Sequence, residues 1–354
     1  MTDSSQNDGT SKRSQFLLEH VDIEINHRCN LLCKHCSARA VRAKAGVDEL
    51  SVDDLKKILH SAASLGLRNV GLTGGEPLMD KEKLENIARF CLDDLGVPVH
   101  THSNGTLVTV EMCKQGGVLS LFESVSVTFL GGNAESHDSI TQVKGSFKRS
   151  FEGARIIADA GLPLTCYFIP TNQTCHEFKA LAAELHNVGV RRIRAMALAP
   201  SGRARTIYDK TIPDIDEMRV FEKDLLQIGA ELSIQIEAGN CTRMSMPGLS
   251  ILAGHERCMS GLNRVHINSR GDVFPCTAAS GVSELMLGNL RDSAFDLKEI
   301  WFASPLVRNI RALQRKILDG CNECSRIKKC YDTCMVNVIG TMNSAELKAC
   351  ALFR

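Results

Sequence analysis

The stretch VDIEINHRCNLLCKHC, residues 21–36, decides the fold of this chain. Its first six residues alternate apolar and polar side chains, as a β-strand does. Its end holds three cysteines, Cys29, Cys33 and Cys36, spaced C-x3-C-x2-C. Structural zinc usually takes four ligands and disulfides take cysteines in pairs, so three neighbouring thiols indicate a site whose last ligand comes from elsewhere. A zinc site completed by a distant residue is the alternative.

A strand–helix alternation continues from this stretch. Residues 51–66 have the pattern of a helix, with Ser51 as N-cap and Asp54 in the capping-box position. Further strands are expected at 69–74, 97–104, 124–130, 162–169 and 191–199, with helical patterns between them. Such a repeat predicts an α/β fold in which a parallel sheet is joined by crossover helices.

Three motifs follow predicted strands. They are the cysteine loop, GGEP at 74–77 and SNGT at 103–106. In a curved parallel α/β barrel, functional residues collect just past the carboxyl ends of the strands. Taken alone, GGEP is also compatible with a turn and SNGT with a tight hairpin turn, so their order along the chain carries the argument.

Composition excludes several classes of protein. The chain has 354 residues, 44% of them hydrophobic, and its formal net charge is +1, with 42 basic and 41 acidic residues. This balance gives no support to nucleic-acid binding, and we find no apolar run of transmembrane length and no signal peptide. Fifteen cysteines, an odd number, favour metal ligation in a reducing cytoplasm. Residues 1–14 are polar and predict a disordered tail.

The composition and pattern of the sequence change after about residue 240. Cysteines become denser, and residues 264–276 have the pattern of a hairpin that turns at Arg270 and Gly271. We therefore expect one domain over residues 15–237 and a second, smaller one over residues 238–354. The second contains Cys258, Cys276, Cys321, Cys324, Cys330, Cys334 and Cys350.

The cysteine loop and GGEP together resemble the radical S-adenosylmethionine (SAM) enzymes. The resemblance implies a partial (β/α)6 barrel like a TIM barrel, with a 4Fe–4S cluster held by Cys29, Cys33 and Cys36 and SAM on the fourth iron. It implies that His35 lies by the adenine and that Gly74, Gly75, Glu76 and Pro77 hold the methionyl amine. Ser103, Asn104, Thr128 and Arg203 are the remaining residues expected at the cofactor. A solvated loop is the alternative for Arg203.

The C-terminal cysteines resemble the SPASM domain, a small Cys-rich α+β module with two auxiliary 4Fe–4S clusters. The resemblance implies that Cys258, Cys276 and Cys334 hold one cluster. Cys321, Cys324, Cys330 and Cys350 would hold the other. The first set lacks a fourth cysteine, for which Cys241 is one candidate, and a zinc ribbon is the alternative for residues 321–334.

The resemblance also implies a mechanism. The reduced cluster cleaves SAM, and the resulting 5′-deoxyadenosyl radical takes a hydrogen atom from the substrate. The expected partners are an electron donor such as flavodoxin or ferredoxin and a peptide or small-molecule substrate. A peptide would require direct binding or a separate recognition protein. Cys166, on a predicted strand, is a candidate hydrogen donor, although buried cysteines commonly act as small hydrophobes.

Peptide or protein maturation is the leading hypothesis. The alternatives are a small-molecule oxidoreductase or epimerase in cofactor, haem or antibiotic biosynthesis, and a non-catalytic iron–sulfur electron carrier. A pure carrier would complete the ligation of its cluster, which the three-cysteine loop does not.

Overall fold

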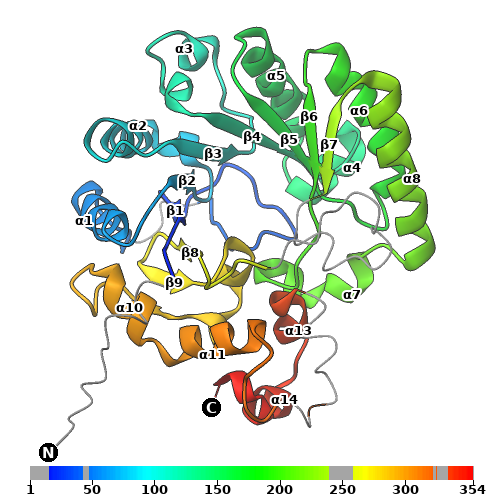
Figure 1. Ribbon diagram of the computed structural model, residues 1–354. Helices are drawn as coiled ribbons and strands as arrows, with labels where there is room; N and C mark the ends of the chain where they lie inside the picture. Colours follow the sequence, from blue (N-terminus) through cyan, green and yellow to red (C-terminus); the bar gives the residue numbers. More distant parts are fainter. Residues whose placement is uncertain (1–15, 43–47, 239–257, 322–323, 325–333, 354) are drawn as a thin grey trace, which may run out of the picture.

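The computed structural model describes residues 16–42, 48–238, 258–321, 324 and 334–353. The predicted tail at residues 1–14 lies outside this range. The described residues form one ten-stranded sheet in the order β10-β9-β8-β1-β2-β3-β4-β5-β6-β7. Figure 1 shows the strands curving around a centre, with helices along the outer side. The predicted α/β fold with a partial parallel barrel is confirmed.

Seven parallel strands make the barrel part of the sheet. They are β1 (His20–Glu24), β2 (Asn69–Thr73), β3 (Val99–Ser103), β4 (Ser124–Phe129), β5 (Leu164–Phe168), β6 (Arg192–Ala195) and β7 (Gln235–Ala238). Each of the six strands predicted from the sequence is present. The predicted domain boundary falls at the end of β7, a strand that the sequence analysis did not identify, and the boundary stays a prediction.

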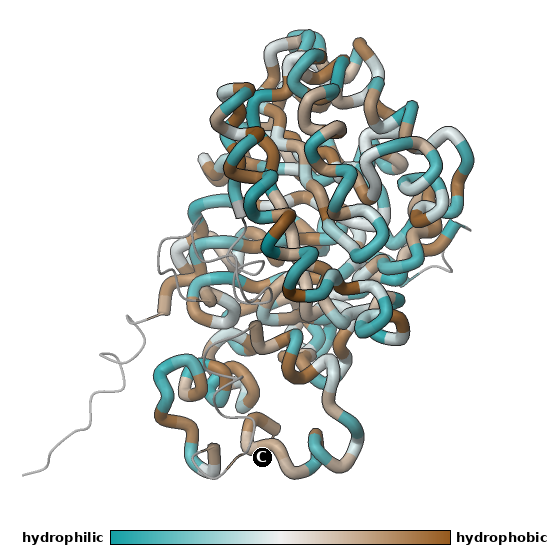
Figure 2. Tube along the Cα trace, turned by 90° about the vertical axis from the view of Figure 1, so that its right-hand side faces the viewer, coloured by the Kyte–Doolittle hydropathy of each residue, from teal (hydrophilic) through white to brown (hydrophobic). Residues whose placement is uncertain are grey.

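Helices lie between or after these strands along the chain. They are α1 (Val52–Ala63), α2 (Lys81–Arg89), α3 (Val110–Cys113), α4 (Ala134–Thr141), α5 (Ser146–Asp159), α6 (Phe178–Asn187), α7 (Tyr208–Thr211) and α8 (Ile215–Leu232). The predicted capping box of α1 is confirmed, because the Ser51 hydroxyl accepts from the Asp54 amide and the Asp54 carboxylate accepts from the Ser51 amide. Hydrophobic and hydrophilic residues alternate along the helices, as expected of helices with one buried face (Figure 2).

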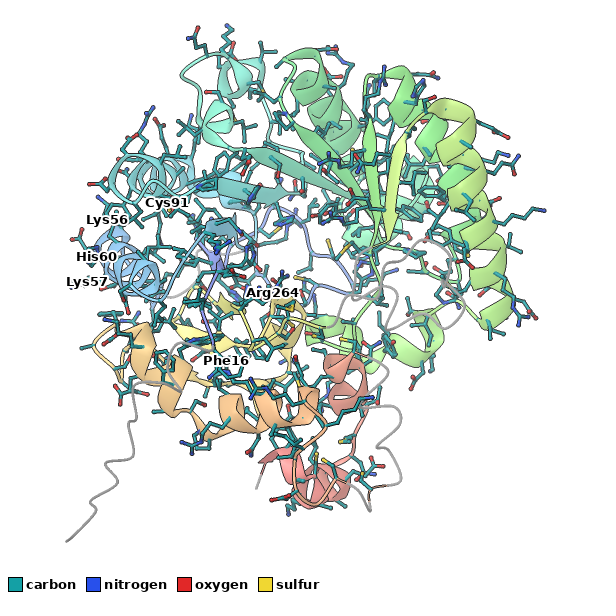
Figure 3. All side chains as sticks on the ribbon, viewed as in Figure 1. Phe16, Lys56, Lys57, His60, Cys91 and Arg264 are labelled. Atoms are coloured by element: carbon teal, nitrogen blue, oxygen red, sulfur yellow. The ribbon has the colours of Figure 1, made fainter. Side chains whose placement is uncertain are left out.

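Side chains fill the space between strands and helices (Figure 3). Alternate residues of the central strands, such as Val21, Ile23, Val125 and Val127, are fully buried in the core. Among the described residues, no helix is long and apolar enough to cross a membrane.

The C-terminal part extends the same sheet. Strand β8 (Arg264–Ile267) pairs in parallel with β1, although the two are about 240 residues apart, and it turns back antiparallel into β9 (Asp272–Phe274). The predicted hairpin is confirmed, and Gly271, with φ +93°, makes its left-handed turn. Strand β10 (Gly288–Asn289) follows, and then α10 (Leu297–Ala303), α11 (Pro305–Gln314), α13 (Met335–Gly340) and α14 (Ser344–Ala349).

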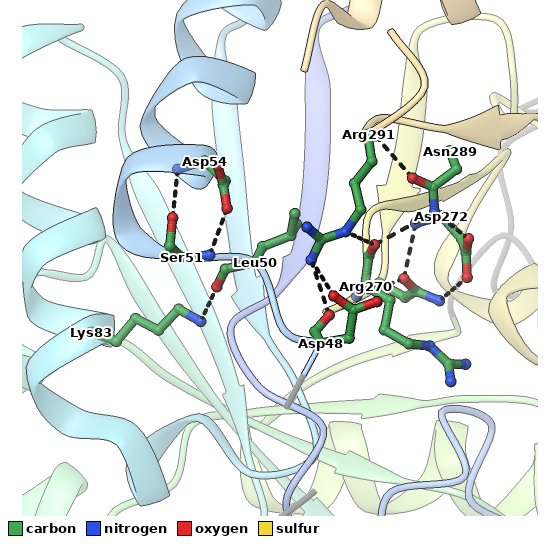
Figure 4. A network of polar contacts seen from close by, with 10 residues as sticks. Asp48, Leu50, Ser51, Asp54, Lys83, Arg270, Asp272, Asn289 and Arg291 are labelled. Carbon is green, nitrogen blue, oxygen red and sulfur yellow. Dashed lines mark hydrogen bonds and ion pairs between the residues drawn. The ribbon is translucent and has the colours of Figure 1, made fainter. Parts of the chain in front are cut away.

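A polar network joins the hairpin to the loop before α1 (Figure 4). The Arg291 guanidinium pairs with the Asp48 carboxylate at 3.1 Å and donates to the Asp48 carbonyl at 3.1 Å. The same side chain donates to the Arg270 carbonyl, and the Leu50 amide donates to the Ser269 carbonyl at 2.7 Å. The C-terminal strands are therefore fixed to the barrel by side chains as well as by the β1–β8 pairing.

Further polar contacts cross from β1 to the C-terminal part. Glu24 and His266 form a fully enclosed pair at 3.1 Å. Asp22 pairs with His20 at 3.1 Å and accepts from the Thr277 hydroxyl at 3.0 Å. Thr277 directly follows Cys276, so the strand that leads to the cysteine loop also positions a candidate ligand of the C-terminal part.

Candidate functional site

The cysteine loop follows β1 at the carboxyl end of the sheet. Cys29, Cys33 and Cys36 lie in one small cluster of contacts that includes Leu31 and Ala40. Burial, followed by the charges of neighbouring groups including the other thiolates, raises the pKa of Cys29 to about 12 and also raises the pKa of Cys33. Three gathered thiols that repel each other when ionised fit a site where a cationic metal cluster neutralises them.

The geometry of these thiols bears on the zinc alternative. Within the part of the chain that the structure describes, no three His, Cys, Asp or Glu side chains converge as ligands of one metal ion. A cubane takes each thiolate at a different iron, so its ligands do not need to converge on one point. The loop therefore fits a cluster better than a single zinc ion.

Arg203 holds this loop from the opposite side of the barrel. It lies in the short helix η6 (Gly202–Thr206) after β6. Its guanidinium donates to the carbonyls of Cys33 and Ala40, both at 2.8 Å, and its amide donates to the Cys36 carbonyl at 3.0 Å. Arg203 is thus neither a solvated loop residue nor wholly open to a ligand, because two of its side-chain nitrogens bind the cysteine loop.

The GGEP turn lies against the chain that leads into the cysteine loop. The amides of Gly75 and Glu76 donate to the carbonyls of Asn26 and Arg28 at 2.9 and 2.7 Å. A Cβ on Gly75 would lie 2.2 Å from the Arg28 carbonyl oxygen, so only glycine fits there. Pro77 begins the short helix η2 (Pro77–Asp80), for which Glu76 is the N-cap.

The Glu76 carboxylate is used inside the scaffold. Its side chain is fully buried and accepts from the Leu78 amide at 3.1 Å, the Ser103 hydroxyl at 2.7 Å and the Asn104 amide at 2.7 Å. These contacts also give the carboxylate and the Ser103 hydroxyl a role in the scaffold, and their contact with the cofactor stays a prediction. Both groups position the ends of β2 and β3.

Asn104 connects this scaffold to the cysteine loop. The side-chain amide of Asn104 donates to the side-chain oxygen of Asn30 at 2.9 Å and to the Cys29 sulfur at 3.7 Å. The Asn30 amide in turn donates to the Thr106 hydroxyl at 2.7 Å. The structure therefore joins the cysteine loop, GGEP and SNGT in one network. Asn30 was missed, because a polar residue between cysteines has no distinct sequence signal, and Thr106 was recognised only as part of the SNGT motif.

The buried Glu76 carboxyl predicts a pH-dependent stability. Burial raises its pKa from the ordinary value of 4.5 to about 7, although hydrogen bonds from Asn104, Ser103 and Leu78 oppose the shift. Between these two pH values the native state binds more protons than the unfolded state, so stability should fall as pH rises from about 5 to about 7. The shift in the Glu76 pKa corresponds to a change on the order of 3 kcal/mol in the free energy of unfolding over this pH range.

Urea unfolding of the cluster-free protein at several pH values tests this expectation. Glu76→Gln should remove this part of the pH slope, whereas Glu82→Gln, at an exposed site on α2, should retain it. Equal slopes in the wild type and the Glu76 variant would show that the carboxyl does not titrate in this range.

His35 and Thr128 line different parts of the site. His35 is 7% exposed, its Nε2 atom has no partner among the described residues, and burial, with Arg203 and His137 nearby, lowers its pKa to about 4. It is therefore a neutral ring beside Cys36. Thr128 is half-buried and lies in register with Tyr167.

Cys166 lies on the other face of the sheet. It pairs in register with Val127 and Ile193 and belongs to the apolar core, while its neighbour Tyr167 points to the inner face. The next core residue, Phe168, contacts Phe178 of α6, which fixes the outward direction of this face. The expectation that Cys166 points into the barrel as a hydrogen donor is therefore wrong.

Some of the C-terminal cysteines lie close to one another. Cys321, Cys324 and Cys350 are near enough that the latter two help to raise the pKa of Cys321, after burial. Cys276 is the N-cap of η7 (Thr277–Gly281), and Cys334 is the N-cap of α13. Both elements pack on residues 200–202. A Cβ on Gly281 would lie 2.1 Å from the Gly202 amide, and a Cβ on Gly340 would lie 2.4 Å from the Pro200 carbonyl. Cys330 and Cys241 lie outside the described residues.

Comparisons with known proteins agree with this arrangement. The model of the radical SAM superfamily matches residues 23–196, and the model of the SPASM iron-sulfur cluster-binding domain matches residues 258–325. The chain is 28% identical over 326 residues to the AdoMet-dependent heme synthase of Nitratidesulfovibrio vulgaris. The aligned region covers 87% of this chain and 84% of that protein. The chain is 27% identical over 314 residues to the mycofactocin maturase MftC of Mycolicibacterium smegmatis, covering 88% and 76%.

Solved structures share the fold. Streptococcus suis SuiB bound to S-adenosylmethionine matches with a TM-score of 0.69 and 19% identity, over 93% of this chain and 76% of that one. The AdoMet-bound anSMEcpe matches with a TM-score of 0.65 and 16% identity, over 92% of both chains. Proteins with these two modules use SAM, a SAM-binding 4Fe–4S cluster and auxiliary 4Fe–4S clusters. The chain therefore belongs to the radical SAM superfamily and is a SAM-cleaving enzyme with a C-terminal SPASM domain.

Proposed function

We propose that this enzyme matures a peptide or protein by removing a hydrogen atom from one of its carbon atoms. The observation that carries the proposal is a row of side chains across the inner face of the barrel. Thr128, Tyr167, Arg194 and Glu237 lie in register on β4 to β7, on the face opposite the apolar core.

This row is polar but electrically neutral. The Arg194 guanidinium forms a hydrogen-bonded pair with the Glu237 carboxylate, with one contact at 2.9 Å, and lies 5.8 Å from the centre of the Tyr167 ring. Hydroxyl groups and a neutralised ion pair suit the amides of a peptide chain. They suit a substrate with several carboxylates less well, because such a substrate needs unpaired cations.

The roles of the site residues form part of the proposal. Cys29, Cys33 and Cys36 would hold the SAM-binding cluster, with SAM against the backbone of Gly74, Gly75 and Pro77, the His35 ring, the Asn104 amide and Thr128. Glu76, Ser103 and Arg203 would lie at the same cofactor and also hold the surrounding scaffold. One auxiliary cluster would use Cys258, Cys276 and Cys334, and the other Cys321, Cys324, Cys330 and Cys350. When bound, the SAM cluster supplies the electron that cleaves SAM.

The proposal extends to the surroundings of the enzyme. We expect an electron donor such as flavodoxin or ferredoxin, a cytoplasmic location, and a separate peptide-recognition protein if the substrate does not bind directly. The division into domains at residues 237 and 238 is part of the same proposal.

A second candidate is a tetrapyrrole substrate. It is favoured by the 27–28% identity to AdoMet-dependent heme synthases from Nitratidesulfovibrio vulgaris and Methanosarcina barkeri. PqqA peptide cyclases, however, also match at 23–26% identity. The inner-face row decides our preference for the peptide.

One experiment separates the two candidates. The reduced enzyme is incubated with SAM and either a short peptide encoded beside its gene or a carboxylated tetrapyrrole, and the products are analysed by mass spectrometry. We expect the peptide to lose hydrogen atoms while 5′-deoxyadenosine accumulates. Conversion of the tetrapyrrole with an unchanged peptide would refute the proposed substrate class.

The contacts of Arg203 predict a specific loss of SAM cleavage. Arg203→Gln removes two charge-assisted hydrogen bonds to the cysteine loop. Each such bond contributes ~1.5–3 kcal/mol to holding the cysteine loop in place. Because the loop would then position SAM less well, the rate of 5′-deoxyadenosine formation should fall about tenfold or more. The auxiliary iron should remain.

Arg205→Gln is the matched control. Arg205 lies on the same short helix but faces the SPASM side, where it donates to the Gly340 carbonyl at 3.1 Å and pairs with Glu284 at 3.1 Å. It should retain SAM cleavage. An equal loss in both variants would indicate general destabilisation of η6 instead of a specific effect on the loop.

A further inference from the structure

Arg311 is a buried cation in the C-terminal part. It lies on α11, and its side chain is 7% exposed. The guanidinium stacks on the rings of Trp301 and Phe16, at 4.1 and 4.3 Å from their centres. Phe16, labelled in Figure 3, is brought here by a hydrogen bond from the Trp301 indole to its carbonyl at 3.0 Å. The charge is therefore enclosed by aromatic rings.

No carboxylate neutralises this charge among the described residues. The Nε atom donates to the Gly261 carbonyl at 2.9 Å and Nη1 to the Trp301 carbonyl at 3.0 Å, while Nη2 has no partner there. Burial and, to a smaller extent, the neighbouring Arg315 lower the pKa of Arg311 to about 10. Two carbonyls and two aromatic rings stabilise the guanidinium without neutralising it, so its positive charge is available to a neighbouring anion.

The same helix holds the turn that follows Cys258. The Gln314 amide donates to the Ser260 carbonyl at 2.7 Å, and the Cys258 thiol donates to the Ser260 hydroxyl at 3.2 Å. A Cβ on Gly261 would lie 3.1 Å from Ile310 of α11 and 3.9 Å from Pro275, the residue before Cys276. Arg311 and Gln314 thus hold the backbone that carries one candidate cluster ligand and lies beside another.

We propose that Arg311 is a positioning residue for the auxiliary iron–sulfur cluster at Cys258 and Cys276, and that the negative charge of this cluster is its counter-charge. The inference rests on the proposed assignment of these two cysteines as ligands. A cluster ligated by thiolates is anionic, and one-electron reduction makes it more negative. A nearby buried cation stabilises the reduced form and raises the reduction potential.

Redox titration of the reconstituted full chain, followed by electron paramagnetic resonance, tests the proposal. Arg311→Gln removes the charge, and Arg311→Lys retains it. Arg315→Gln is the matched control: Arg315 is exposed, lies one helical turn further along, and its guanidinium is 4.6 Å from the same Phe16 ring. The Gln variant at 311 should shift one auxiliary cluster to a more negative midpoint potential, and the Lys variant should shift it much less. The SAM cluster and the control should not change.

Iron analysis covers the case in which Arg311→Gln cannot retain the cluster. Selective loss of about 4 iron atoms per chain, with the SAM cluster and the circular dichroism spectrum intact, would support the proposal. Unchanged potentials with all clusters present, equal shifts at positions 311 and 315, or loss of the whole fold in both Arg311 variants would overturn it. Full iron content in Cys258→Ala would instead refute the assignment of Cys258 as a cluster ligand. This result distinguishes a wrong ligand assignment from a wrong role for Arg311.

Discussion

Replacing Cys29, Cys33 and Cys36 together by alanine should abolish SAM cleavage. The reconstituted wild-type chain should hold about 12 iron atoms for three cubanes, and the triple variant should lose about 4 of them. The loss should be complete, because these thiols form one cluster of contacts and nothing else in the described site supplies thiolates. Iron analysis and chromatographic detection of 5′-deoxyadenosine under reducing conditions measure both effects.

The control for this variant uses cysteines from the core. Cys91 and Cys113 are 0% and 5% exposed and lie among apolar residues of the barrel wall. Their joint replacement by alanine removes thiols from the same protein at a modest cost in packing, and it should leave iron content and SAM cleavage intact. If 5′-deoxyadenosine still formed in the triple variant, SAM would be cleaved elsewhere and the proposed site would be wrong.

The sequence was sufficient for the local elements and for the order of the motifs. The strands have short apolar runs, α1 has a complete capping box, and the three motifs occur after successive strands. The shared edge of a parallel sheet then brings the motifs together, which follows from topology alone.

Long-range pairings were not predictable in the same way. Strand β8 pairs with β1, and no local pattern in either segment specifies a parallel partner so distant in the chain. The direction of Cys166 was also hidden. Its strand, LTCYF, mixes apolar residues on both faces, so period-two alternation cannot identify which face is the core.

The sequence also did not show which partners the polar side chains contact. Arg203 was recognised as a candidate, but its carbonyl partners on the cysteine loop lie about 170 residues earlier in the chain. Glu76 was expected at the cofactor, and the sequence did not indicate that its carboxylate also accepts from Ser103, Asn104 and Leu78. Side-chain type predicts what a residue can bind, and only the packed structure shows which partner it has.

Gly202→Ala should disrupt the SAM cluster through backbone contact alone. Gly202 has φ +58°, and a Cβ there would lie 2.2 Å from the Ser37 carbonyl oxygen and 2.4 Å from that of Cys36. Neither oxygen can move without shifting the end of the cysteine loop. We expect most of the SAM-cluster iron to be lost and 5′-deoxyadenosine formation to fall at least about tenfold, which corresponds to ~1.4 kcal/mol.

Gly96→Ala separates this contact from the strain of the left-handed backbone. Gly96 has a similar φ of +64°, is exposed, and has nothing within 4 Å of the position of a Cβ. Both variants therefore carry a conformational cost of roughly 1–2 kcal/mol, but only Gly202→Ala forces a methyl group against the loop. Thermal unfolding should show destabilisation in both variants, larger in Gly202→Ala because of the added clash, while iron retention and SAM cleavage should differ sharply between the two. Equal SAM cleavage in the two variants would mean that the loop tolerates displacement, and that the tight approach of η6 to Cys36 and Ser37 does not position the cluster.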